Sequence, residues 1–390
     1  NGLNIGEARE MPQDTGSLPA ELPVYGKRNI NKILDQMLSS LPPDRENKIC
    51  LICQPEYEFL YDLISVLCEK SKYHIEHIIC MENTDCNVDY NKYNLQSLSK
   101  LAPLFIADCD YQIYYYYANI NSHFYNINLF PYLICTEKAV IQLTADLEYG
   151  LYLSETHSVD LFQNIFESYK RKTMPLILFN PNINDICERQ ELVKKGPGTN
   201  YTISPQPCLG NLLDQKEFLK YLKKDLEHRD EIQKSLEDSL VQGESICPID
   251  SLYSFFSKEG IRDLLVNGHM VDLTEQYYED ISPEFHWKMI HKLYHAILDG
   301  TFHGYLLDTQ RLHMQRDLYL SIFHDEVVSC CFKKKNGTWG TFTINERSLT
   351  ESFVHFAEYL HKSDFVLPRE EMLEFLKNIL EETKKVDHKS

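Results

Sequence analysis

The 390-residue chain lacks several features that would define its function at once. No apolar run approaches the roughly 18 residues that a membrane-spanning helix needs, so we expect no membrane association. Positive charge is scarce, because 39 Lys and Arg stand against 58 Asp and Glu for a net charge of −19. A chain this acidic offers no extended basic surface to a phosphate backbone, which disfavours nucleic-acid binding by the chain itself.

Common catalytic and metal-binding motifs are also missing. Gly196-Pro197-Gly198 lacks the Lys-Ser/Thr that completes a phosphate-binding loop, and no Gly-x-Ser-x-Gly is present. Cys50 and Cys53 form the only Cys-x-x-Cys, with no second pair to complete a zinc set. We interpret the twelve cysteines as buried free thiols of a cytoplasmic protein.

The composition is that of a folded protein of more than one domain. Hydrophobic residues make up 43% and aromatic residues 12% of the chain, which is enough to bury a core. A length prior of roughly 150 residues per domain predicts two or three domains. Residues 1–28 lack periodicity and are interpreted as a tail or linker.

Hydrophobic periodicity predicts an α/β succession in the first half. Strands at 48–53 and 73–81 flank a helix at 56–70, which is typical of a parallel β-α-β unit. The pattern also predicts helices at 29–41, 92–107 and 158–170, and strands at 132–136, 139–144, 150–154 and 176–179.

Residues 181–250 are predicted to connect the two halves. Asn180–Pro207 is rich in Pro, Gly and Asn and is interpreted as a loop, and 212–240 has the spacing of one long helix or two abutting helices. Beyond this connector, capped helices are expected at Ser257–Gly268 and Ser282–Gly300, strands at 318–323, 326–332 and 339–344, and helices at 349–362 and 368–385.

The two halves share one succession of elements. In residues 132–170 and again in 320–362, two strands joined by an acidic turn precede a third strand and then a helix with apolar-x-x-Phe spacing. Such a β-β-β-α unit packs a helix onto a sheet, and two copies suggest a pseudo-symmetric pair. We therefore predict an α/β fold with a first half at 29–180 and a second at 251–390.

With the preceding β-α-β unit, this pattern resembles the half-domain of the phospholipase D family. That family's chemistry needs His-x-Lys-x(4)-Asp, with the His as the covalent nucleophile. Only His286 is followed by Lys two positions later, Lys288, and Leu293 stands where the Asp is required. The resemblance therefore implies degenerate phospholipase-D-like halves without the enzyme, and we predict no catalytic residues.

A second resemblance concerns regulation. Residues 254–268 and the helix leading to Leu298-Asp-Gly-Thr resemble the C-terminal region of large Gram-positive helix-turn-helix transcription regulators. This implies a non-catalytic effector region, with the DNA-binding module expected upstream of residue 1 and DNA contacted only through that module. The resemblance also implies a homodimer, because such regulators read two half-sites, and 212–240 and 368–385 offer candidate helical seams. The alternative is a hydrolase that acts on phosphodiesters through a rearranged site.

Two pairs of histidines were weighed as metal ligands. His74 and His77 would point to opposite faces of a strand. His291 and His295 are four apart on a helix and could share a metal, but no carboxylate completes the usual pattern, so we interpret them as part of a solvated basic face. We predict no metal and no cofactor.

The Tyr-rich segment 111–125 is the strongest candidate for a ligand surface, although a strand with Tyr on both faces is the simpler explanation, because β-propensity alone favours Tyr there. Ligands of open α/β sheets bind at the carboxyl ends of parallel strands, and polar or acidic residues follow both predicted strands. We therefore predict a small, neutral or cationic effector, or a peptide, contacted by Gln54, Glu82, Tyr114, Tyr116 and His123.

Overall fold

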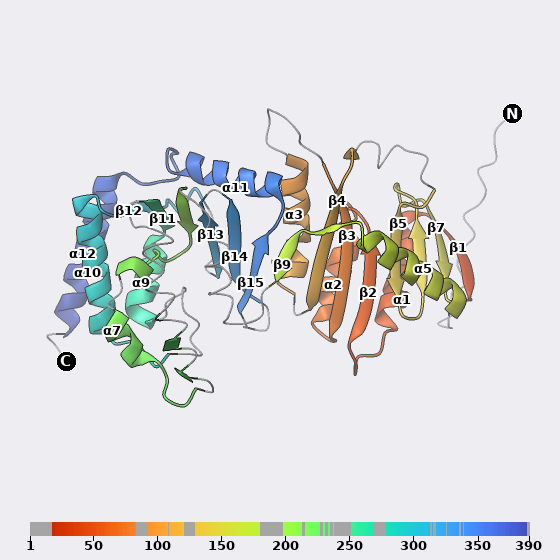
Figure 1. The fold of residues 1–390 in the computed structure, drawn as a ribbon, viewed down its shortest axis with the longest axis horizontal. Coiled ribbons are helices and arrows are strands. Elements are labelled where there is room, and N and C mark those ends of the chain that lie inside the picture. The colour runs from red at the N-terminus through yellow and green to blue at the C-terminus, as the bar shows by residue number, and fades with distance from the viewer. Residues whose placement is uncertain are drawn as a thin grey trace. The chain divides into compact units, whose positions relative to one another are not determined.

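The computed structural model describes residues 18–82, 92–107, 109–120, 129–179, 198–212, 215–226, 251–268, 278–312, 317–324, 326–334 and 339–387, with a few single positions between them. The chain folds as two compact units, unit 1 (residues 1–177 with 334–336) and unit 2 (residues 178–333 with 337–390). Each unit has its own large sheet flanked by helices (Figure 1), so the predicted mixed α/β class is confirmed.

Unit 1 is built on an eight-stranded sheet with the strand order β1-β7-β6-β5-β2-β3-β4-β8. Strands β2, β3 and β4 are parallel to one another, whereas β5, β6, β7 and β1 continue the sheet antiparallel. The strands are β1 (Glu21–Tyr25), β2 (Asn47–Ile52), β3 (Tyr73–Met81), β4 (Asp110–Tyr117), β5 (Tyr132–Thr136), β6 (Val140–Leu143), β7 (Tyr149–Leu153) and β8 (Met174–Pro175).

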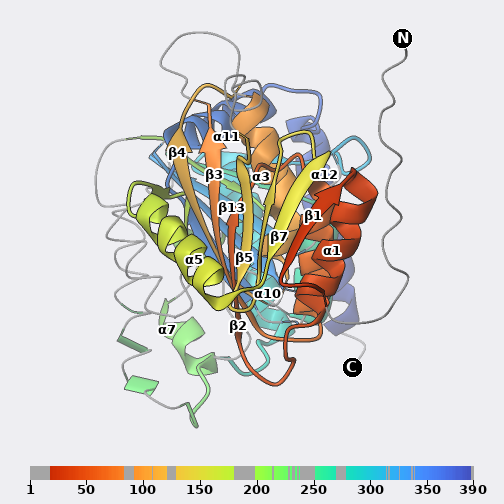
Figure 2. The ribbon, with the colours of Figure 1, turned by 90° about the vertical axis from the view of Figure 1, so that its right-hand side faces the viewer.

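The helices of unit 1 cover both faces of this sheet. They are α1 (Lys27–Ser39), α2 (Glu58–Cys68), α3 (Lys92–Phe105) and α5 (Thr156–Lys170). Figure 2 shows α5 on one side of the strands and α1 and α3 on the other. The α5 side is a small core of alternate strand residues and one helix stripe, which includes Cys50, Ile78, Cys135, Val159 and Phe166. Period-2 strands and a period-3.6 helix thus meet as their patterns predict.

The predicted tail is wrong from Glu21 onward. Residues 21–25 form β1, which pairs with β7 through register partners that include Pro23 and Leu151. Because β1 lies at the end of the sheet, Pro23 interrupts no second ladder, and an edge strand tolerates a proline. Five residues without clear alternation gave no strand signal in the sequence.

Unit 2 is built on a seven-stranded sheet with the order β12-β11-β10-β13-β14-β15-β9. Its strands are β9 (Ile177–Phe179), β10 (Asn200–Ile203), β11 (Leu252–Phe256), β12 (His303–Leu306), β13 (Leu318–Phe323), β14 (Val327–Lys333) and β15 (Trp339–Ile344). Its helices are α7 (Gln215–Phe218), α9 (Lys258–Asn267), α10 (Pro283–Asp299), α11 (Arg347–Leu360) and α12 (Arg369–Asp387), with 3₁₀ turns at Gly210–Leu212 and Leu219–Tyr221.

The two sheets have the same topology. The sheet order in unit 1, β1-β7-β6-β5-β2-β3-β4, corresponds strand by strand to the order β9-β15-β14-β13-β10-β11-β12 in unit 2. Corresponding strands also follow one another in the same order along the chain. Three neighbouring strands are parallel in both units, β2 to β4 and β10 to β12. The next three pairings along each sheet are antiparallel in both. Helices α5 and α11 follow the third antiparallel strand in each unit, so the predicted β-β-β-α succession is present twice.

The connector prediction is wrong in two places. Asn200–Ile203, assigned to a loop, is β10 and lies in the middle of the second sheet. One continuous helix across 212–240 is wrong, because α7 is short and Leu222 makes a bridge with Tyr278, whereas the described positions 229–230, 233–234 and 237 are helical, as the alternative of two helices allows. Leu222 is buried in the core of unit 2, so tertiary packing overrides its helical spacing.

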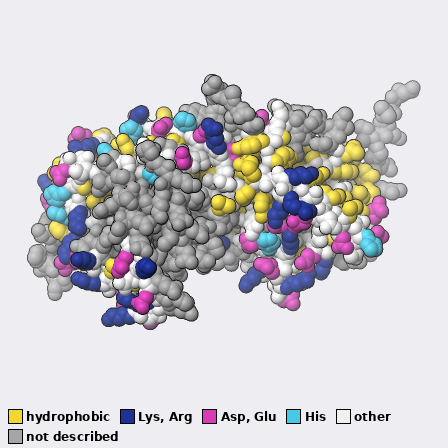
Figure 3. Space-filling view, viewed as in Figure 1, with side chains coloured by type: hydrophobic (Ala, Val, Ile, Leu, Met, Phe, Trp, Pro, Cys, Tyr) yellow, Lys and Arg dark blue, Asp and Glu magenta, His cyan; other side chains and the backbone are white. Residues whose placement is uncertain are grey.

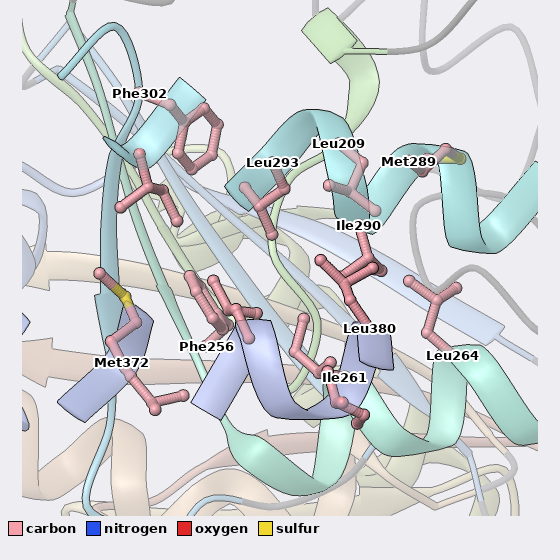
Figure 4. Close-up of a cluster of buried hydrophobic side chains, with 14 of the residues drawn as sticks. Leu209, Phe256, Ile261, Leu264, Met289, Ile290, Leu293, Phe302, Met372 and Leu380 are labelled. Carbon is pink, nitrogen blue, oxygen red and sulfur yellow. The ribbon is translucent and has the colours of Figure 1, made fainter. Parts of the chain in front are cut away.

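The core of unit 2 lies where α9, α10 and α12 pack against β11 and β12. Figure 4 shows Phe256, Ile261, Leu264, Ile290, Leu293 and Met372 converging from four of these elements. Both predicted helix caps are confirmed: Ser257 and Ser282 accept hydrogen bonds from Gly260 and Phe285, and Gly268 and Gly300 end their helices in the left-handed conformation. His286, the histidine of the His-x-Lys pair, is buried on α10.

Candidate functional site

The predicted site residues of unit 1 lie at two different places on its sheet. Tyr114 and Tyr116 share the β4 face that packs against α5, as period-2 geometry predicts. The Tyr114 hydroxyl donates to Gln112, and the Lys170 ammonium lies 4.9 Å from the Tyr114 ring centroid. Burial and the nearby Cys80 thiol raise the pKa of Tyr116.

Gln54 and Glu82 lie at the carboxyl ends of β2 and β3, where both side chains already have hydrogen-bonding partners. Gln54 Oε1 accepts from the Cys80 amide at 3.3 Å, and Glu82 Oε2 accepts from the Ile120 amide at 3.0 Å. Backbone groups of Glu82 also bond to the Asn94 side chain at 2.9 and 3.1 Å. These hydrogen bonds link the carboxyl ends of β2 and β3 to each other and to residues 94 and 120. His123 lies outside the described residues.

A network of ion pairs occupies the α5 face of unit 1 at the amino-terminal ends of its parallel strands. Glu76 is 3% exposed, and its carboxylate lies 2.8 Å from the Lys48 ammonium and in contact with the Lys170 ammonium. Lys48 also reaches Glu167 at 3.1 Å. In Figure 3, Lys and Arg side chains lie beside Asp and Glu side chains near the C-terminal end of α5. The lysines are therefore neutralised and offer no open phosphate site.

The electrostatics of Glu76 follow from these partners. Burial by itself would raise the pKa of Glu76, but hydrogen bonds and charge from Lys170 and Lys48 outweigh burial and place it below its ordinary value. The same interactions outweigh burial at Lys48 and raise the pKa of its ammonium. The network therefore has a structural role, because its ion pairs connect β2, β3 and α5.

His77 is buried on the other face of the same strand. Its Nδ1 lies 2.7 Å from the Tyr111 hydroxyl and its Nε2 lies 2.8 Å from the Cys53 carbonyl, which fixes the proton on Nε2. Burial lowers the pKa of His77 to about 4, despite the carbonyl that it contacts. A neutral histidine whose two ring nitrogens both have buried hydrogen-bonding partners is a core residue and not a catalytic base.

Unit 2 has an aromatic pair at the position that matches Tyr114 and Tyr116. Strand β12, the counterpart of β4, carries His303 and Tyr305 two residues apart on one face. Both stack on Tyr253 of β11, with ring centroids 4.9 and 5.9 Å apart. The sequence analysis missed this pair, because four residues with one Gly give no clear strand signal.

A cavity of about 480 Å³ lies in unit 2 beside the end of β15. It is bounded by β9, the start of β14, the end of β15 and the first turn of α11, through Leu178, Glu326, Val327, Thr343, Ile344, Asn345, Glu346, Arg347, Thr350 and Glu351. This volume is within the range of roughly 300–1,000 Å³ typical of small-molecule sites. Leu178, Val327 and Ile344 supply apolar wall, and the other side chains are polar.

Thr343 lines this cavity, but its hydroxyl is closed off from solvent. Thr343 is 5% exposed, and its Oγ1 is buried without a hydrogen-bond partner. Its register partner on β14, Ser329, has a buried hydroxyl that is also unpartnered. These two end a row of buried hydroxyls across the sheet that continues through Ser321, Thr202 and Ser254. A buried polar group without a partner costs roughly 1–3 kcal/mol, so the two unpartnered hydroxyls lower the stability of the sheet and supply no ligand contact in the cavity.

The charge of the cavity favours a cation. Its lining has three carboxylates and one guanidinium, from Glu326, Glu346, Glu351 and Arg347, and Arg347 pairs with Glu351 at 2.7 Å. The start of α11 would attract an anion, but the Glu346 carboxylate already accepts from the Ser348 and Leu349 amides at 3.0 and 2.8 Å. The helix terminus is therefore occupied, and negative charge dominates.

Neither a metal centre nor the phospholipase-type motif is assembled in the described part of the chain. No group of three or more His, Cys, Asp or Glu among those residues could hold a metal ion. His286 and Lys288, the nearest approach to the motif, lie on α10 with His286 buried and Lys288 paired to Glu217 and Glu284. No described helix is long and apolar enough to cross a bilayer.

Comparison with known proteins gives no family. No protein-family model matches the chain, and no curated protein matches it. Among solved structures, it is similar to TrmBL2, described as an archaeal chromatin protein with a novel mode of DNA binding, at 11% identity and a TM-score of 0.27 over 41% of this chain. The match spans 54% of that structure's chain. A similarity this low supports no conclusion about function.

Proposed function

We propose that this chain is the effector-sensing region of a transcription regulator and that it binds a small cation without catalysing a reaction. The observation that carries the binding site is the acidic cavity beside the end of β15, whose lining has three carboxylates and one guanidinium. The assignment to transcription rests on the sequence resemblance to regulator effector regions, which also implies a DNA-binding module upstream, a cytoplasmic protein and a homodimer.

Binding is favoured over catalysis because the buried ionisable groups have structural partners. His77 is held neutral between Tyr111 and Cys53, and Glu76 is neutralised by Lys48 and Lys170. A hydrolase acting on phosphodiesters needs a free nucleophile beside a cation that holds phosphate. Neither of these sites provides that arrangement.

The two units are proposed to be degenerate phospholipase-D-like halves. Support comes from the matching strand order and from α5 and α11, each of which closes its unit after the third antiparallel strand. The family's His-x-Lys-x(4)-Asp is missing from the whole sequence. A fold of this kind would leave the scaffold free for ligand binding.

The proposed effector is a small primary amine with an apolar part. An ammonium group has three donors, which suits the carboxylates of the cavity, and a short hydrocarbon chain suits Leu178, Val327 and Ile344. The charge of Glu326 would then discriminate amines from neutral alcohols of equal size.

Thermal-shift titration with a panel of primary amines and diamines tests this proposal. Neutral sugars, nucleosides, short peptides and inorganic phosphate serve as contrasts. We expect amines alone to raise the melting temperature, and Glu326→Gln to abolish the shift, whereas Thr343→Val should keep it because its hydroxyl is out of reach of the cavity. Because Thr343→Val removes an unpartnered buried hydroxyl at nearly constant volume, the unliganded variant should be as stable as the wild type or slightly more stable.

The double variant Tyr114→Ala with Tyr116→Ala is the matched control. If amine shifts persist in Glu326→Gln but vanish in that double variant, the effector site is the aromatic face of unit 1 and the cavity assignment is wrong. Turnover of generic phosphodiester substrates by the purified chain would instead establish the hydrolase alternative. Light scattering that gives a monomer mass over a wide concentration range would contradict the homodimer.

A further inference from the structure

Two histidines on the outer side of α10 have ring nitrogens that face each other. His291 and His295 are one turn apart, their Nε2 atoms are separated by 3.2 Å, and their ring centroids by 4.5 Å. Side chains four residues apart project from the same helix face. His295 is exposed and His291 half-buried, so solvent reaches the pair.

Neighbouring side chains hold the His291 ring in position. The Trp287 indole stacks on it with centroids 4.9 Å apart and an interplanar angle of 24°. The indole N–H in turn donates to the Leu380 carbonyl of α12 at 3.2 Å, so that the ring on which His291 stacks is itself fixed. Tyr294 meets His295 edge-on at 5.3 Å. A pair fixed in this way loses little side-chain freedom when it binds a ligand.

The separation of the two nitrogens matches the bite of one metal ion. With Zn–N bonds of 2.0–2.1 Å and a tetrahedral angle, two imidazole nitrogens on one zinc lie about 3.3–3.4 Å apart. We propose that His291 and His295 chelate one Zn²⁺ ion through their Nε2 atoms, with water in the remaining positions. The sequence alone could not show this, because i,i+4 spacing leaves the rotamers undetermined.

The surroundings select the kind of ion. Neutral imidazole suits Zn²⁺ and its transition-metal neighbours and not Mg²⁺ or Ca²⁺, which prefer oxygen ligands. The two lysines on the same part of α10 are occupied elsewhere, since Lys288 pairs with Glu217 and Glu284 and Lys292 donates to the Leu212 carbonyl at 3.3 Å. The site therefore has two protein ligands and open coordination positions.

Calorimetric titration of the untagged chain with Zn²⁺ tests the inference, with His291→Ala, His295→Ala and His355→Ala as variants. His355 is an exposed helical histidine whose described ionic partner is Glu358 at 3.3 Å, so it controls for the loss of any one surface imidazole. Loss of one of the two ligands should weaken the site by at least tenfold, since changes in outer-shell partners alone cost 10–100-fold.

We expect one equivalent of Zn²⁺ to disappear from the titration in His291→Ala and in His295→Ala and to remain in His355→Ala. Cu²⁺ bound at the same site should show two equivalent nitrogens in its paramagnetic resonance spectrum, and only one in either single variant. Both substitutions are on the outer side of α10, so circular dichroism should show the same helix content as the wild type. Unchanged zinc affinity and stoichiometry in both single variants would overturn the proposal.

Discussion

At the scale of single residues, Glu76 shows how a buried charge becomes a structural element. Its carboxylate is enclosed by α5 and neutralised by Lys48 and Lys170, whose ammonium groups remain partly exposed. Removal of one partner from a buried ion pair costs roughly 3–5 kcal/mol, and partial solvation of the lysines reduces that cost. We expect Glu76→Gln to lower the free energy of unfolding by about 2–3 kcal/mol at pH 7, measured by urea denaturation.

Glu167→Gln is the matched control, because Glu167 contacts the same Lys48 from a half-exposed position and should cost less than about 1 kcal/mol. The pKa of Glu76 is depressed, so its contribution is present above the ordinary glutamate pKa and is lost as pH falls through the folded value. The difference between wild type and Glu76→Gln should therefore shrink below pH 4. A constant difference from pH 7 to pH 3 would contradict this account.

His77 predicts a second pH dependence. In the folded state its pKa is lowered to about 4, whereas an unfolded histidine has a pKa near 6.5. Between these values the unfolded state binds one more proton, so stability is complete above pH 6.5 and falls by up to about 3 kcal/mol as pH approaches 4. We expect denaturation curves of His77→Gln to lose this slope, and those of His74→Gln, altered on the α5 side of the same strand where the ring is partly exposed, to keep it.

Sequence reasoning at this scale identified faces but not partners. Alternation placed Tyr114 and Tyr116 on one face and separated His74 from His77, and the structure confirms both. It could not place Thr343 beside α11 or Trp287 against His291, because these contacts depend on rotamers and on elements far apart in the chain. The predicted contact of a ligand with Gln54, Glu82 and His123 stays a prediction.

At the scale of elements, α9 depends on a glycine inside its first turn. A Cβ on Gly260 would lie 1.7 Å from the Pro205 carbonyl oxygen, which also accepts hydrogen bonds from the backbone and side chain of Ser257. The backbone would have to move to admit any side chain. We expect Gly260→Ala to lower the free energy of unfolding by about 3 kcal/mol or more, as overpacking against backbone does.

Gly300→Ala is the control that separates the steric clash of an added Cβ from the cost of a left-handed backbone conformation. Gly300 ends α10 with a φ of 77° and has open space around its missing Cβ. Only the left-handed conformation is penalised there, at about 1–2 kcal/mol. Equal costs for Gly260→Ala and Gly300→Ala would show that the contact with Pro205 relaxes without penalty.

Elements with strong periodicity were predicted within a few residues, and weak ones were missed. β3, β13 and β15 have the predicted ends, and α10 begins and ends at its predicted caps. β1, β10 and β12 have four or five residues each and include Pro or Gly, or follow a Pro- and Gly-rich segment. Such strands are specified by their neighbours in the sheet and not by their own sequence.

At the scale of the whole molecule, the two units share one topology although their sequences differ. The β-β-β-α succession could be recognised from pattern, because it lies in continuous, strongly apolar segments. Its extension to seven matched strands could not, because β1, β10 and β12 gave weak signals or follow a segment that resembles a loop. The apolar stripe of α12 is not available as the helical dimer seam expected at 368–385, because its side chains are buried in the core of unit 2. They are Met372, Leu376, Ile379 and Leu380.

Unit 1 should fold without the rest of the chain. Residues 18–177 contain a complete eight-stranded sheet with helices on both faces, and its buried side chains come from within that range. We expect this fragment to be monomeric and to unfold in one cooperative transition in urea, as small domains with their own core do.

A fragment ending at residue 153 is the matched control. It lacks α5 and with it Phe166, which is fully buried in the intact unit, so the face that holds Cys50 and Ile78 would be exposed. That shorter fragment should show no cooperative transition, and a non-cooperative 18–177 fragment would mean that unit 1 depends on unit 2 for its stability.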